Sequence, residues 1–136
     1  MYLLDTDILS NLMRRTPSTT LIAKLASVPP EQQSTTSITY GELIYGAHRL
    51  GAQAAALLER LENTLPPHLP ILPFDAAAAR RYGEIRADLE QRGTPIGDAD
   101  LRIAAIALAR GLTVVTGNTR HFQKIPDLQV ENWLAG

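Results

Sequence analysis

The chain opens with Tyr2-Leu3-Leu4-Asp5-Thr6-Asp7-Ile8-Leu9-Ser10, the stretch around which the fold is built. The apolar run before Asp5 predicts a short strand, and the spacing of the apolar residues after Asp7 predicts a helix. In an α/β sheet, ligands bind just outside the carboxyl ends of the strands, so we expect Asp5 at a binding edge. Asp7 and Thr6 are residue types that cap helices, and capping is the expected role of Asp7.

Length and composition set the class of protein. The chain has 136 residues, of which 45% are apolar, which indicates one domain spanning residues 1–136. It contains no cysteine, which excludes disulfides, zinc–thiolate sites and a thiol nucleophile. The N-terminus lacks the pattern of a signal peptide, and no apolar run approaches the ~18 residues of a transmembrane helix. We therefore expect a soluble cytoplasmic protein that makes no contact with a membrane.

Strand-like and helix-like segments alternate along the chain. Strands are expected at residues 2–4, 34–37, 69–72, 112–116 and 128–131. The segments between them carry helical apolar spacing, including an Ala-rich helix capped by Asp75 and another ended by Gly111. This alternation predicts an α/β domain with a parallel sheet of four to five strands flanked by helices.

Polar side chains fall just after strands or at helix starts in four places: Asp5, Glu42, the pair Asp98 and Asp100, and Asn118. Each also has a structural interpretation. Glu42 follows Thr39 by three residues, as in a capping box. Asp98 precedes a helix starting at residue 99 and is placed to cap it, and Asp100 suits the positive end of the helix dipole.

Taken together, these acids indicate a metal site. One edge of a parallel sheet would collect them, and gathered carboxylates repel one another unless a cation neutralises them. Mg²⁺ or Mn²⁺ prefers such oxygen ligands. None of His48, His68 and His121 has metal-ligand spacing, and no serine has a Gly-x-Ser-x-Gly setting. Water activated by a metal is therefore the best candidate nucleophile.

The positive charge outside this acidic set favours a phosphate-bearing ligand. Without Asp5, Glu42, Asp98 and Asp100, the chain carries thirteen positive charges against ten negative. Eleven of the thirteen are arginines, whose guanidinium groups bind phosphate bidentately. The arginines that could form a phosphate-binding surround are Arg14, Arg15, Arg49, Arg80, Arg81, Arg86 and Arg120.

Four motifs, in order, resemble those of a known family. They are Leu-Leu-Asp-Thr-Asp (3–7), Gly-Glu-Leu (41–43), Pro-Ile-Gly-Asp-Ala-Asp-Leu-Arg-Ile-Ala-Ala (95–105) and Val-Val-Thr-Gly-Asn-Thr-Arg-His-Phe (114–122). The whole chain looks like a PIN-domain ribonuclease, and more narrowly like the VapC-type toxin of a bacterial toxin–antitoxin pair. The resemblance implies Mg²⁺- or Mn²⁺-dependent endonucleolytic cleavage of RNA, with a cognate antitoxin as protein partner.

The resemblance also implies roles for particular residues. The catalytic acids would be Asp5, Glu42 and Asp100, with Asp98 and Asn118 as further metal ligands and Arg120, Thr116 and Thr6 as substrate-binding residues. The position of Asn118 is often Asp in the family, which weakens a second metal site. Asp98 and Asp100 can converge only if Asp98 lies in the loop before the helix, because helical residues two apart face different ways.

Two other functions are compatible with parts of the pattern. Asp5-Thr6-Asp7 and residues 97–100 also resemble the acidic motifs of haloacid-dehalogenase-type phosphatases. Those enzymes need a lysine between the motifs, and neither Lys24 nor Lys124 is suitably placed after a strand. The second alternative is a non-catalytic RNA- or protein-binding domain of the same fold, against which the retained acids argue.

The helical stretch at residues 42–65 predicts an assembly. It carries more apolar and small residues than one buried stripe requires, so its second face needs a cover. We expect a homodimer, and an antitoxin that places an arginine near Asp5, Glu42 and Asp100.

Overall fold

The computed structural model describes residues 1–65 and 69–134, with a parallel sheet at its centre. The strands are β1 (Tyr2–Leu4), β2 (Gln33–Thr36), β3 (Ile71–Leu72), β4 (Thr113–Val115) and β5 (Val130–Glu131), in the order β3-β2-β1-β4-β5. All four neighbouring pairs are parallel, which confirms the predicted α/β class. Pro66, Pro67 and His68 lie outside the described residues.

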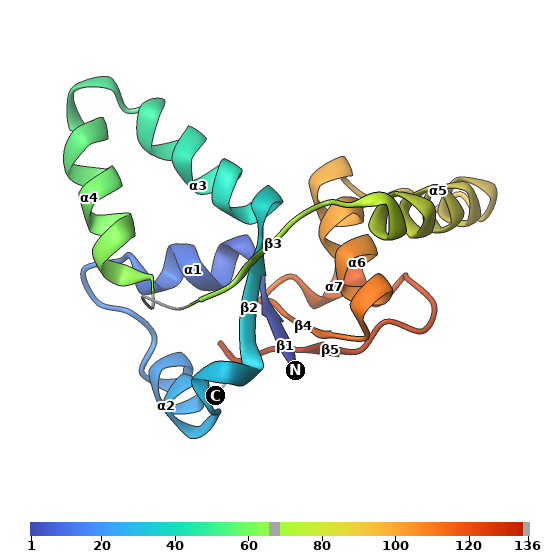
Figure 1. Cartoon of the computed structure of the whole chain (residues 1–136), viewed down its shortest axis with the longest axis horizontal. Helices are drawn as coiled ribbons and strands as arrows, with labels where there is room; N and C mark the ends of the chain where they lie inside the picture. Colours follow the sequence, from blue (N-terminus) through green and yellow to red (C-terminus); the bar gives the residue numbers. More distant parts are fainter. Residues whose placement is uncertain (66–68, 135–136) are drawn as a thin grey trace.

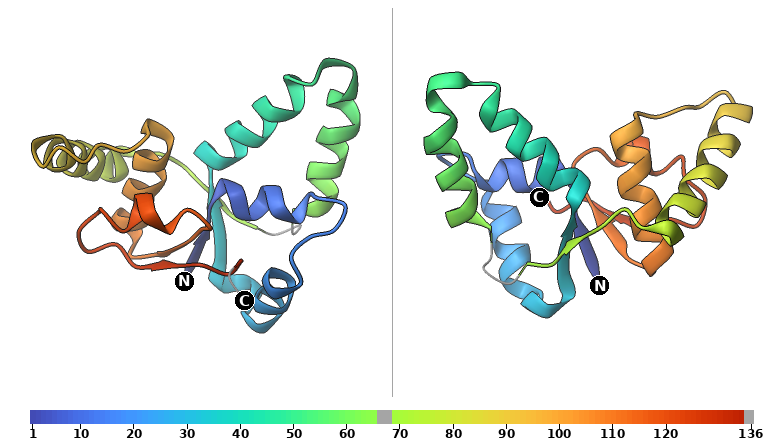
Figure 2. Two further views of the ribbon diagram at one scale, coloured as in Figure 1. Left: turned by 180° about the vertical axis from the view of Figure 1, so that it is seen from behind. Right: turned by 45° about the horizontal axis from the view of Figure 1, so that its top comes forward.

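The helices form a layer on each side of this sheet. They are α1 (Thr6–Leu12), α2 (Thr19–Ser27), α3 (Ser37–His48), α4 (Ala54–Thr64), α5 (Ala76–Gln91), α6 (Asp98–Arg110) and α7 (Thr119–Phe122), with 3₁₀ turns at Pro30–Gln32 and Gly51–Gln53. Figures 1 and 2 show α1 to α4 on one side and α5 to α7 on the other. No described helix is long and apolar enough to cross a membrane.

Alternation along the central strands separates two apolar cores. Leu3 and Val114 belong to the core shared with α5 and α6. Leu4 and Val115 belong to the core shared with α1 and α2. The strands are therefore buried on both faces, as expected for a parallel sheet.

Helix boundaries test the capping predictions directly. Asp75 caps α5 by accepting the Ala78 N–H at 3.0 Å, and Gly111 ends α6 with φ 67°, as predicted. The capping box of Thr39 and Glu42 is wrong, because α3 begins at Ser37. Its cap is the hydroxyl of Thr36, which accepts the Thr39 N–H at 3.1 Å.

Candidate active site

Asp5 lies at the carboxyl end of the central strand. It is the N-cap of α1, since its Oδ1 accepts the Thr6 N–H at 2.7 Å. Its Oδ2 accepts the hydroxyl of Thr116, which follows β4, at 2.8 Å. Only 4% of Asp5 is exposed. The predicted capping by Asp7 is therefore wrong: Asp5 fills both the binding edge and the cap.

Asp7 instead lies in the first turn of α1 and faces the loop after β4. Its Oδ2 accepts the Gly117 N–H at 2.8 Å, and its Oδ1 lies 3.4 Å from the Thr116 hydroxyl. Sequence reasoning missed this role. The available signal was that one helix has one N-cap, so that assigning Asp5 to it would have released Asp7 for another contact.

Burial and mutual repulsion perturb both carboxyls. The pKa of Asp5 is raised to about 7, mainly by burial and also by the charges of Asp7 and Asp100, although hydrogen bonds from Thr116 and Thr6 act to lower it. The pKa of Asp7 is raised by burial first and also by Asp100. The three acids thus lie within electrostatic reach of one another, as the predicted acidic edge requires.

Glu42 joins this edge from α3. Its Oε1 accepts the Thr6 hydroxyl at 2.7 Å, and the Thr6 hydroxyl lies 3.1 Å from that of Thr39. Thr6, predicted to bind substrate, is therefore engaged by protein groups that connect α1 to α3. Glu42 itself is exposed, so its carboxylate remains open to a ligand.

Asp100, Asn118 and His121 form the opposite side of the site. The Nδ1 of His121 lies 3.1 Å from Asp100 Oδ2 and 2.9 Å from Asn118 Nδ2. One ring nitrogen cannot both donate to the carboxylate and accept from the amide, so the tautomer of His121 selects one contact. Sequence reasoning set His121 aside, because its 21-residue separation from Asp100 carries no metal-ligand pattern.

Asp98 does not join the other acids. It is the first residue of α6, not a loop residue, and the N-cap position belongs to Gly97. Its carboxylate accepts the hydroxyl of Tyr82 and pairs with Arg102 at 2.8 Å. The Tyr82 hydrogen bond is the main cause of its lowered pKa. Asp98 is therefore not the helix cap that the sequence predicts. It also does not lie in the preceding loop, the position from which it could converge with Asp100 on a metal.

Arg120 is exposed on α7, two residues after Asn118. It makes no ion pair within residues 1–65 and 69–134. Its guanidinium is thus free to meet a phosphate, in keeping with its predicted role.

The donor chemistry of the site fits a hard divalent cation. Carboxylate oxygens are the ligands that Mg²⁺ and Mn²⁺ prefer. A bound cation would favour the charged forms of Asp5 and Asp7, whose pKa values are raised by burial first and by mutual repulsion second. Residues 1–65 and 69–134 hold no group of three acids or histidines already in ligating geometry. The fit therefore rests on charge and donor type.

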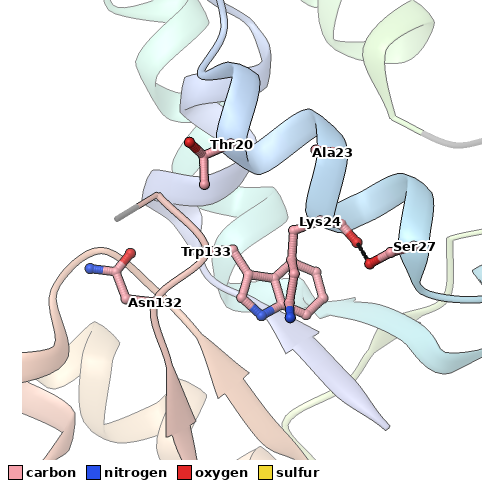
Figure 3. A pocket seen from close by; sticks show the side chains of 6 residues that line it. All are labelled: Thr20, Ala23, Lys24, Ser27, Asn132 and Trp133. Carbon is pink, nitrogen blue, oxygen red and sulfur yellow. Dashed lines mark hydrogen bonds between the residues drawn. The ribbon is translucent and has the colours of Figure 1, made fainter. Parts of the chain in front are cut away.

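A separate pocket lies between α2 and the C-terminal segment (Figure 3). Its cavity of about 520 Å³ is lined by Thr20, Ala23, Lys24, Ser27, Asn132 and Trp133. Figure 3 shows the Trp133 indole and the Lys24 side chain among the groups that line it, and none of the described lining residues carries a carboxylate. It therefore lacks the acids that the sequence analysis associates with catalysis.

Comparison with known proteins identifies the family of this chain. The PIN domain family profile matches residues 2–128, nearly the whole chain. The chain belongs to the PIN-domain family. This PIN domain is 34% identical to the tRNA(fMet)-specific endonuclease VapC of Shigella flexneri over 97% of both chains.

Two solved structures are similar to this PIN domain over their whole length. The crystal structure of FitAcB from Neisseria gonorrhoeae matches with a TM-score of 0.89 and 36% identity, covering 100% of both chains. VapBC2 from Rickettsia felis, bound to a DNA fragment from their promoter, matches with a TM-score of 0.86 and 34% identity over 97% of this chain and 98% of that one. These similarities confirm the predicted resemblance to VapC-type PIN domains.

Proposed function

We propose that this PIN domain is a Mg²⁺- or Mn²⁺-dependent endoribonuclease and the toxin of a toxin–antitoxin pair. The observation that carries the proposal is Asp5: a nearly buried carboxyl at the central strand end, with Asp7 and Asp100 close enough to raise its pKa. Such a perturbed acid at a sheet edge is typical of a functional site. The relatives named as ribonucleases support the reaction class.

Asp5 and Asp100 would hold the cation, with Glu42 as a third oxygen donor. When bound, the cation supplies positive charge at the scissile phosphate and lowers the pKa of its water. Thr116 orients Asp5 through its hydroxyl, and Thr6 orients Glu42. Arg120 is placed to bind a neighbouring phosphate from α7.

Asp5→Asn tests the proposal with little change of shape. We expect the variant to lose Mg²⁺-dependent RNA cleavage by at least about 100-fold, since a ligating charge is removed. The matched control is Asp88→Asn, a partly exposed acid of α5 that pairs with Arg92 at 2.8 Å, which should cleave like wild type. Full activity of Asp5→Asn would reject the site.

A tRNA is the substrate class to assay first, since the Shigella relative is named for one. Purified tRNA and an unstructured RNA of equal length would be compared with Mg²⁺ and with Mn²⁺. Cleavage confined to tRNA would support a structured target. Equal cleavage of both would limit the proposal to a general ribonuclease.

The same assays separate the two alternatives. A phosphatase would release phosphate from a monoester and leave RNA uncut, whereas a non-catalytic domain would do neither. Mn²⁺ calorimetry on wild type and Asp5→Asn adds a readout that needs no turnover. Equal Mn²⁺ affinities for the two proteins would contradict a metal at Asp5.

A second surface supports an antitoxin partner. An apolar groove of about 910 Å³ runs between α1 and α2 and is lined by Leu9, Leu12, Ile22 and Leu25 among others. Ile22 is 48% exposed there. An apolar groove with an exposed isoleucine is a candidate site for a protein partner. Structures of VapBC complexes align with this chain, so we assign the groove to a segment of the antitoxin.

A further inference from the structure

We propose that Asp7 is a positioning residue that clamps the turn at residues 116–118 against α1 and thereby sets the geometry of the whole acidic site. The expected effect on catalysis rests on the proposed nuclease function. The clamp itself rests only on the contacts that Asp7 makes.

The clamp consists of consecutive hydrogen bonds along the turn. Thr116 donates its hydroxyl to Asp5 at 2.8 Å, and the same oxygen accepts the Asn118 N–H at 2.9 Å. Between them, the Gly117 N–H donates to Asp7 Oδ2 at 2.8 Å. The Thr116 proton is used on Asp5, so the 3.4 Å contact with Asp7 is secondary. The main partner of Asp7 is therefore the Gly117 backbone.

Position 117 leaves no room for a side chain beside Asp7. A Cβ at this position would lie 2.8 Å from Asp7 Oδ2 and 2.8 Å from Leu134 Cδ1. Both distances are shorter than Cβ contacts in proteins, so the side chains of Asp7 and Leu134 would have to shift to admit any larger residue. The requirement comes from the close approach of Asp7 and Leu134, not from a left-handed backbone conformation.

The clamp reaches both sides of the site. At one end, Thr116 holds Asp5. At the other, the Asn118 side chain contacts His121, which in turn contacts Asp100. A shift of this turn would therefore move groups on both sides of the metal position together. Since a displacement of about 1 Å can cost about 100-fold in rate, a clamp here has a catalytic consequence.

Positioning and ligation make opposite demands on Asp7. A clamp needs only an acceptor for the Gly117 N–H, which an asparagine Oδ1 supplies, whereas a ligand role needs the negative charge. We expect Asp7→Ala to lower kcat for RNA cleavage by about 100-fold with KM little changed. We expect Asp7→Asn to recover most of that loss.

Gly117→Ala tests the same clamp with every carboxylate present. We expect it to lower kcat as Asp7→Ala does, because its Cβ displaces Asp7. Gly83→Ala in α5 is the matched control, since a Cβ there meets nothing within 4 Å. Thermal melting of each variant verifies folding.

Amide hydrogen exchange of metal-free protein reads the clamp without activity. Gly117 is exposed, so its N–H should be protected only through Asp7. Protection in wild type and Asp7→Asn, with its loss in Asp7→Ala, supports the clamp. If Asp7→Asn stays protected but loses as much activity as Asp7→Ala, or if wild type is unprotected, the proposal is overturned. A wild type with no RNA cleavage but a protected Gly117 would refute the nuclease function and leave the clamp standing.

Discussion

Two features of the Asp5 environment have opposite effects on its pKa. As the N-cap of α1 it accepts a backbone N–H, an interaction that favours its charged form. As a nearly buried acid beside Asp7 and Asp100 it is driven toward the neutral form, and burial is the larger effect. In metal-free protein, the native state therefore keeps a proton on Asp5 up to about pH 7.

This raised pKa predicts how stability depends on pH in EDTA. Between the ordinary pKa of 3.8 and about 7, the native state holds a proton that the unfolded state has released. The free energy of unfolding should fall as pH rises through this window, by up to about 1.4 kcal/mol per unit. Asp5→Asn should flatten the slope and melt higher than wild type at pH 8. A smaller dependence of stability on pH should remain in Asp5→Asn, because the pKa of Asp7 is also raised.

The measurement is urea unfolding of both proteins at pH 3, 6 and 8. Their stabilities should converge at pH 3, where Asp5 is largely protonated in both the native and the unfolded state, since even its ordinary pKa is 3.8. Adding Mg²⁺ at pH 8 should stabilise wild type more than the variant, because the ion binds the folded form. A wild type that is more stable than Asp5→Asn in EDTA at pH 8 would contradict the account.

At the scale of elements, the sequence predicted most of the fold and part of the site. The five strands and the caps at Asp75 and Gly111 were predictable because local pattern decides them. The assignment of α1 and α3 caps failed. Asp5 and Asp7 are equally good caps by residue type, and so are Thr36 and Thr39. The position at which the strand ends, two or three residues earlier or later, decides between them.

The contacts that complete the site could not be predicted from the sequence, for a different reason. Gly117 with Asp7 and His121 with Asp100 join segments 110 and 21 residues apart. No local spacing encodes such pairs. The contact of Asp7 with Gly117 follows only once the parallel register of β1 and β4 places both strand ends together.

The cap of α5 provides an element-scale prediction. Asp75→Ala removes the acceptor for the Ala78 N–H, so the free energy of unfolding should fall by about 1 kcal/mol. Asp88→Ala, on the exposed face of the same helix, should cost less, because a surface ion pair contributes little. Chemical denaturation of both variants makes the comparison. Equal losses would show that the cap adds nothing beyond surface charge.

At the scale of the molecule, exposed apolar residues mark two separate surfaces. Leu50, 52% exposed, lies between α3 and α4, which extend together from the sheet (Figure 1). Ile22, 48% exposed, lies in the groove between α1 and α2. The two residues are similarly exposed but lie on different surfaces. A substitution at one of them can therefore serve as the control for the same substitution at the other.

We assign the first surface to the expected homodimer. Light scattering at micromolar concentration should give the mass of two chains for wild type and for Ile22→Asp, and of one chain for Leu50→Asp, since a buried unpaired carboxylate opposes association. A wild-type monomer, or an Ile22→Asp monomer with a Leu50→Asp dimer, would reject the assignment.

The groove should carry the antitoxin, and its inhibition should act through the acids. Ile22→Asp should weaken antitoxin binding at least about tenfold, roughly 1.4 kcal/mol, while Leu50→Asp should bind it like wild type. We expect the antitoxin chain to continue beyond the groove and to bring an arginine to Asp5, Glu42 and Asp100. A guanidinium pairs bidentately with carboxylates and would compete with the cation for the same oxygens. Changing the antitoxin arginines singly to alanine should therefore identify one whose loss restores RNA cleavage in excess Mg²⁺ while the complex stays assembled. If every such complex stays inactive, the antitoxin blocks RNA access without touching the acids, and the groove alone accounts for inhibition.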